Sequence, residues 1–92
     1  MIASFKCRET EKIWNRKTSR KFSAISAVAH RCLWMISIAD TLNDLRIPPG
    51  NRLEKLSYDR KGQHSIRIND QWRICFKWIN DAAHDVEITD YH

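Results

Sequence analysis

The fold of this chain is decided by residues 71–79, which read QWRICFKWI. Large apolar side chains alternate with smaller or charged ones, so that Trp72, Ile74, Phe76 and Trp78 form one set and Arg73, Cys75 and Lys77 form the other. A period of two places such sets on opposite faces of a β-strand. We therefore expect a central strand whose aromatic face packs on helices and whose other face carries Arg73 and Lys77 in the open.

Shorter patterns of the same kind surround this strand. One strand is expected to begin within residues 53–56, and two more are expected at residues 63–68 and near residues 83–89. Turns are expected at residues 59–62, 69–70 and 80–81. Asn, Asp and Gly are the residues that tight turns favour. Strands joined by such short turns run antiparallel, so the second half of the chain predicts a meander.

The first half of the chain has helical spacing. Within residues 23–39, six side chains recur at the interval that lines one face of a helix: Ile25, Val28, Ala29, Cys32, Ile36 and Ala39. A shorter helix is expected within residues 8–17, after a short first strand at residues 2–5. Either Asp40 or Thr41 caps a turn at residues 42–46, which the following prolines end.

These elements predict an α+β fold, with an antiparallel sheet of about four to five strands and the N-terminal helices packed on one face. A chain of 92 residues suits a single domain spanning residues 1–92. No apolar run approaches the roughly 20 residues of a membrane helix, and the first residues lack a secretory signal. The three cysteines are odd in number and widely spaced, which favours free thiols over disulfides. We expect a cytoplasmic protein with no membrane contact.

The basic residues cluster in two regions of the chain. Residues 1–21 hold seven Lys or Arg against two Glu, and residues 52–77 hold seven against three acidic residues, whereas residues 78–92 hold four acidic residues and no Lys or Arg. Two basic regions suit a polyanion such as nucleic acid, because neutralising phosphates releases counterions. A solvated basic surface without a ligand is the alternative that composition leaves open.

The sequence ends with a carboxylate, a phenol and an imidazole, at Asp90, Tyr91 and His92. Because the last strand would deliver them beside the central strand, they are candidates for proton transfer next to a phosphate held by Arg73. Ordinary solvent-exposed terminal residues are the alternative. Arg73 likewise has a structural alternative, which is pairing with Asp85 or Glu87 across the sheet.

Several other kinds of site have no support in the sequence. The remaining histidines and the cysteines show no paired ligand spacing, which argues against zinc. No G-x-S-x-G elbow, P-loop or dinucleotide-binding motif is present. His64 alternates with Ile66 and Ile68, which favours a half-buried strand residue over a substrate contact.

Five motifs carry a resemblance to a known family: LNDL at 42–45, PPGNRL at 48–53, GQHSIRIN at 62–69, QWRI at 71–74 and DYH at 90–92. The chain resembles, over essentially its whole length, the host-inhibition-of-growth (HigB) toxins of the RelE/ParE superfamily of bacterial toxin–antitoxin systems. The resemblance implies a RelE-like fold. It also implies an mRNA interferase that enters the A site of the 70S ribosome and cuts the codon there.

The same resemblance implies partners and a site. The partner would be a HigA-type helix-turn-helix antitoxin, and operator DNA would be bound only through the antitoxin complex. Arg73 would clamp the scissile phosphate and His92 would carry the proton. Asp90 would orient His92 or act as a second base, and Tyr91 would position a nucleobase. Attack by a ribose 2′-hydroxyl requires no metal and no cofactor. RNA contacts are expected from Lys55, Arg60, Lys61, Arg67 and Lys77.

The chain departs from the family pattern at two places. Glu54 stands where some members carry His, so it is either a catalytic base or a surface ion-pair partner. Ser57-Tyr58 replaces the usual Lys-Gly, which removes a cation and places a bulky residue where Gly adopts special turn conformations. Two other functions stay open: a ParE-like toxin that poisons DNA gyrase without cutting RNA, and a degenerate toxin that only binds its antitoxin.

Overall fold

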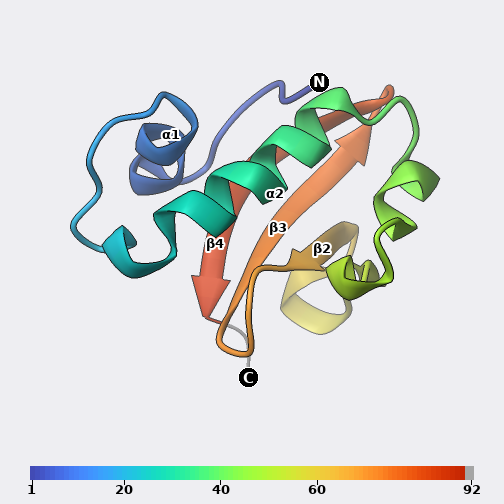
Figure 1. Cartoon of the computed structure of the whole chain (residues 1–92). Helices are drawn as coiled ribbons and strands as arrows, with labels where there is room; N and C mark the ends of the chain where they lie inside the picture. The colour runs from blue at the N-terminus through green and yellow to red at the C-terminus, as the bar shows by residue number, and fades with distance from the viewer. Residues whose placement is uncertain (91–92) are drawn as a thin grey trace.

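The computed structural model describes residues 1–90, and Tyr91 and His92 lie outside the described residues. The described part is an α+β structure in which one antiparallel sheet has the strand order β1-β2-β3-β4 (Figure 1). The strands are β1 (Glu54–Lys55), β2 (Gln63–Arg67), β3 (Trp72–Ile79) and β4 (Ala82–Asp90), and the α-helices are α1 (Arg8–Trp14) and α2 (Ser26–Ile38). Four short 3-10 helices lie in the connections between them: η1 (Ser23–Ile25), η2 (Leu42–Arg46), η3 (Pro49–Asn51) and η4 (Tyr58–Arg60).

The β3–β4 hairpin joins the two longest strands of the sheet, and β3 confirms the pattern of residues 71–79. Its two-residue turn holds Asn80 and Asp81 at φ 52° and 60°. This left-handed geometry at both turn residues matches the right-handed twist of the strands, and Asn and Asp adopt it more readily than most residues. At the other end, the Asn69 side chain accepts hydrogen bonds from the backbone N–H groups of Gln71 and Trp72, at 2.9 and 2.8 Å, and so shapes the β2–β3 turn.

The N-terminal segment covers the outer edge of β4. Ile2 and Phe5 form isolated parallel bridges with Ala83 and Val86. The strand expected at residues 2–5 is therefore reduced to two bridges, because the segment curves away toward α1. Within residues 1–90 the sheet has four strands, at the lower end of the expected number.

Helix α2 packs across one face of the sheet and confirms the helical stripe (Figure 1). Its inner side chains Ala29, Leu33 and Ile36 are fully buried with Ile74 and Phe76 of β3. Helix α1 lies beside β4, where the Thr10 hydroxyl accepts a hydrogen bond from the backbone N–H of Ile88 at 3.0 Å. Within residues 1–90, no helix combines the length and apolar character that a membrane span requires.

The connection from α2 to the sheet is a chain of short turns. Thr41 caps η2 in a capping box, in which the Asp44 carboxylate accepts hydrogen bonds from the backbone N–H groups of Thr41 and Asp40, both at 3.0 Å. These bonds hold the pKa of Asp44 below its usual value. Asn51 is buried, and its side-chain amide donates to the carbonyl of Leu45 at 3.2 Å. The turns thereby fix where the chain reaches β1.

Candidate functional site

The face of the sheet turned away from α2 is the polar face, and two of its rows of side chains surround Arg73. Register aligns Glu54, Ser65, Cys75 and Glu87 in one row, and Arg67, Arg73 and Thr89 in the next. Directly opposite residues of antiparallel strands present their side chains on the same face. The polar face therefore spans all four strands and has Arg73 on a central one.

Arg73 points away from the aromatic face, as expected, but the expectation that it stands in the open is wrong. Only 6% of the residue is exposed. Its Nε donates to the Ser65 hydroxyl at 2.8 Å, and its Nη2 donates to the backbone carbonyl of Arg52 at 2.6 Å. The chain between η3 and β1 brings that carbonyl over the strand, so a loop covers the guanidinium. The acidic residues proposed as its alternative partners pair elsewhere.

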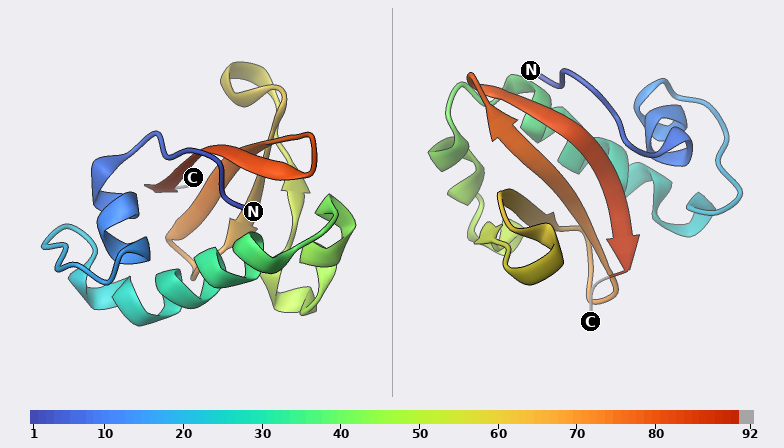
Figure 2. Two further views of the ribbon diagram at one scale, coloured as in Figure 1. Left: turned by 90° about the horizontal axis from the view of Figure 1, so that it is seen from above. Right: turned by 180° about the vertical axis from the view of Figure 1, so that it is seen from behind.

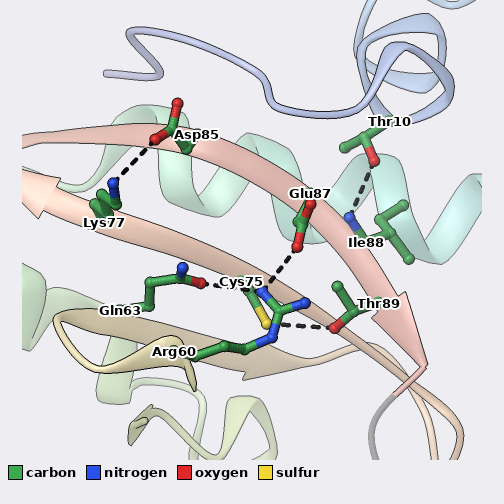
Figure 3. A network of polar contacts seen from close by, with 9 residues as sticks. All are labelled: Thr10, Arg60, Gln63, Cys75, Lys77, Asp85, Glu87, Ile88 and Thr89. Atoms are coloured by element: carbon green, nitrogen blue, oxygen red, sulfur yellow. Dashed lines mark hydrogen bonds and ion pairs between the residues drawn. The ribbon is translucent and has the colours of Figure 1, made fainter. Parts of the chain in front are cut away.

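Those acidic residues hold other cations of the polar face. Glu87 accepts a hydrogen bond from Arg60 Nη1 at 2.7 Å, and the Asp85 carboxylate lies 3.3 Å from Lys77 Nζ (Figure 3). Arg60 Nη1 also lies 3.1 Å from the side-chain oxygen of Gln63. The hydrogen bond to Glu87 raises the pKa of Arg60 above its usual value. Since Arg60 belongs to η4 and Glu87 to β4, this pair ties the β1–β2 loop across the sheet.

The other predicted RNA-binding cations differ in position. Arg67 pairs with Asp70, three residues along the chain. Lys61 is exposed beside η4. Lys55 lies opposite His64 in the register, on the α2 side of the sheet, so it does not share the polar face with Arg73. Exposed ion pairs are weak, so Arg67 and Lys77 can exchange their carboxylate partners for phosphate at little cost.

Glu54 and Asp90 occupy opposite faces. Glu54 is exposed on β1 and lies opposite Ser65, so the register places it on the polar face. Asp90 ends β4 opposite Trp72, which assigns its side chain to the aromatic side, and its carboxylate accepts a hydrogen bond from Gln71 Nε2 at 3.1 Å. The residue of β4 that lies directly opposite Arg73 is Thr89. The predicted sites at Tyr91 and His92 lie outside the described residues.

Three residues of the polar face were missed by sequence reasoning. Ser65 is fully buried and anchors Arg73, and Cys75 contacts the Thr89 hydroxyl at 3.3 Å (Figure 3). The signal for Ser65 was present, because alternation within GQHSIRIN sets it apart from its apolar neighbours. Alternation also placed Cys75 on the face of Arg73, but its contact with Thr89 had no local signal, since the two residues meet only through the β3–β4 register.

His64 lies on the other side of the sheet and confirms the half-buried interpretation. Its ring stacks on Phe76, with centroids 6.4 Å apart. Burial, and then the nearby Lys55, lower the pKa of His64 below its usual value of 6.5. Its Nδ1 is buried without a hydrogen-bond partner among the described residues. Within residues 1–90, no three His, Cys, Asp or Glu residues are gathered so as to hold a metal ion.

The described residues thus form an antiparallel sheet with helices on one face and a polar face that carries a buried Arg. A chain of the YoeB–YefM complex from Staphylococcus aureus has the same fold, with a TM-score of 0.62 and 16% identity over 100% of this chain and 98% of that one. Residues 3–92 match the family described as the RelE-like toxin of the type II toxin–antitoxin system HigB. The chain belongs to this family of HigB-like toxins.

Individual relatives agree with the family. Toxin HigB-1 of Vibrio cholerae is 44% identical over 61 residues, which are 66% of this chain and 64% of that protein. An uncharacterized protein of Haemophilus influenzae is 39% identical over 70% of this chain and 63% of its own length. Endoribonuclease HigB of Proteus vulgaris is 42% identical over 45% of each chain. The aligned stretches thus span less than two thirds of these relatives.

Proposed function

We propose that this toxin is a ribosome-dependent endoribonuclease that cleaves mRNA in the ribosomal A site and is neutralised by a HigA-type helix-turn-helix antitoxin. Membership of the HigB-like family and the relative named as an endoribonuclease support the reaction class. The fold neighbour in a complex with YefM supports an antitoxin partner. Residues 1–92 would act as one cytoplasmic domain, and operator DNA would be bound only through the antitoxin complex.

The observation that carries the proposal is the fixed Arg73 guanidinium on the polar face. Hydrogen bonds to the Ser65 hydroxyl, the Ser65 carbonyl and the Arg52 carbonyl hold it in one orientation before any substrate binds. A cation oriented in advance stabilises the charge that gathers on a phosphate during attack without reorganising at that moment. Its low exposure strengthens this interaction, because water screens it less.

The reaction would be attack of a ribose 2′-hydroxyl on the adjacent phosphorus, with departure of the 5′-oxygen of the next nucleotide. His92 would transfer the proton, Asp90 would orient it or act as a second base, and Tyr91 would position a base. Glu54 is a further candidate base, because it shares the polar face with Arg73. The proposed steps use protein side chains alone and call for no metal or cofactor.

The test is to map cleavage ends on an mRNA in a purified translation reaction with 70S ribosomes. Cuts within the A-site codon that require both toxin and ribosome are expected, whereas the same mRNA without ribosomes should be cut poorly. Ribosomes supply alignment of a flexible strand, which is worth several kcal/mol. Equal cutting of free mRNA would contradict ribosome dependence.

The same reaction separates the two alternative functions. A gyrase poison would leave mRNA intact and inhibit DNA supercoiling by purified gyrase. A degenerate toxin would do neither, yet would still bind its antitoxin. Two features favour testing for a degenerate toxin. Asp90 lies on the aromatic side of the sheet, and Ser57 stands where the family resemblance implies Lys.

A further inference from the structure

Tyr58 is the most exposed of the large hydrophobic residues that the structure describes, with 95% of its surface in water. Its backbone has φ 55°, in the left-handed region that non-glycine residues occupy at a cost. An exposed ring buries no apolar surface, so it does not stabilise the fold. The backbone conformation therefore costs stability and the ring recovers none of it, which directs attention to a ligand.

The loop that carries Tyr58 is fixed to the sheet. Arg60, two residues further on, bridges to Glu87 of β4 and to Gln63 of β2 (Figure 3). The backbone N–H of Lys61 donates to the Tyr58 carbonyl at 3.1 Å, and that of Leu56 donates to the Gln63 carbonyl at 2.9 Å. A ring on an anchored loop loses less conformational freedom when it binds than a ring on a free one.

The loop also lies on the correct side of the molecule for the proposed site. Figure 2 (left) shows the segment around η4 projecting from the sheet on the side away from α2, which is the side of the polar face. Glu87, to which Arg60 is tied, stands in the row next to that of Arg73. Two residues along a strand span about 7 Å.

The charge around the ring suits RNA. Arg60 and Lys61 follow Tyr58 two and three residues later in the chain, and Asp59 is the sole acidic residue of the loop at positions 56–62. Sites for single-stranded nucleic acid combine cations along the backbone with aromatic rings on which bases stack. A protein partner would more often cover such a ring with apolar contacts, and no other large apolar side chain is exposed in this loop.

We propose that Tyr58 is a base-stacking residue of the RNA site, and that its ring receives a nucleobase of the mRNA strand whose scissile phosphate lies at Arg73. The inference rests on the proposed function and adds a binding contact to it. Stacking depends on the ring and not on the hydroxyl.

The experiment measures single-turnover cleavage of ribosome-bound mRNA against toxin concentration for the parent and three variants. Tyr58→Phe keeps the ring. Tyr58→Gly removes it and relieves the backbone strain, and Tyr58→Asn removes it while keeping a residue that tolerates the left-handed conformation. We expect the half-saturating toxin concentration to rise about 10-fold or more for the Gly and Asn variants and to stay within about threefold for Phe.

Thermal melts of the same variants separate binding from folding. The Gly and Asn variants should melt no lower than the parent, because the lost side chain packs on nothing. The stacking contact would be overturned if the half-saturating concentrations of the Gly and Asn variants stayed within about twofold of that of the parent. It would also be overturned if the half-saturating concentration of the Phe variant rose as much as those of the Gly and Asn variants. In both cases the parent would still cleave mRNA, so the proposed function would be unaffected. If the parent itself cuts no ribosome-bound mRNA, the proposed function fails and the inference fails with it.

Discussion

Replacing Arg73 with Lys should weaken both the fold and the reaction, but by different amounts. The acceptors of the guanidinium include the Ser65 hydroxyl at 2.8 Å and, on another residue, the Arg52 carbonyl at 2.6 Å. The single ammonium of Lys cannot reproduce the fork that spans them, so at least one buried acceptor is left unsatisfied. Hydrogen bonds to charged groups contribute about 1.5–3 kcal/mol each, so the substitution should cost about 2–4 kcal/mol of unfolding free energy.

That loss leaves a measurable folded population. Domains of this size have roughly 5–15 kcal/mol of stability, and each kcal/mol corresponds to about 4–8 °C of melting temperature. We therefore expect the Arg73→Lys protein to melt roughly 10–20 °C below the parent. Cleavage of ribosome-bound mRNA must accordingly be assayed at a temperature where the circular dichroism of both proteins shows them folded. Under those conditions the rate should still fall about 100-fold or more, as for the loss of an oriented transition-state donor.

Ser65→Ala is the matched control. It removes one of the same hydrogen bonds and should cost about 1–3 kcal/mol, but it leaves the guanidinium in place. At a temperature where both variants are folded, its cleavage rate should fall by much less than that of Arg73→Lys. If the two folded variants cut mRNA at rates within about threefold of each other, Arg73 is a structural residue and the phosphate-clamp assignment is refuted.

Three further predictions concern single substitutions. His92→Gln should reduce cleavage by roughly two orders of magnitude with an unchanged melting curve, as expected for a lost proton carrier, and a rate within about threefold of the parent would exclude that role. Ser57→Lys restores the cation usual in the family and should raise activity at low salt, with a salt dependence steeper by about one phosphate contact; a flat response across a salt series would mean that residue 57 does not face RNA. The lowered pKa of His64 means that the unfolded chain binds its proton more readily, so the stability contributed by the neutral ring is present above pH 6.5 and lost as pH falls through the folded-state pKa. His64→Leu should therefore flatten the dependence of melting temperature on pH below 6.5. An equally steep dependence in the variant would mean that protonation of His64 is not the cause.

The elements of the fold were predictable because their signals lie close together in the chain. Alternation within residues 71–79 predicts β3 and its aromatic face, and the Asn80-Asp81 pair predicts the turn into β4. The cap at Thr41 follows from its own side chain and that of Asp44, three residues later. Each signal depends on side chains that meet within one turn or one hairpin, so no knowledge of the distant chain is needed.

The candidate site was predictable only in part. Sequence reasoning selected Arg73 and placed its side chain on the other face of the strand from Trp72. The strand register agrees with this placement. Sequence reasoning could not predict the burial of Arg73, because the covering carbonyl belongs to Arg52, 21 residues away. The pairing of Arg60 with Glu87 joins residues 27 positions apart, and it depends on the path that the β1–β2 loop takes over the sheet.

The sequence by itself therefore determined the two helices and the strands of the meander, which of their faces are apolar, and the family to which the motifs point, but not that residues 2–5 form only isolated bridges. The tertiary structure alone decided which cations are held in ion pairs, and on which face Glu54, Lys55 and Asp90 stand. The physical reason is that periodicity acts between near neighbours in the chain. In contrast, strand register and loop paths follow from the packing of the whole core, and a shift of one residue in register exchanges the two faces of a strand.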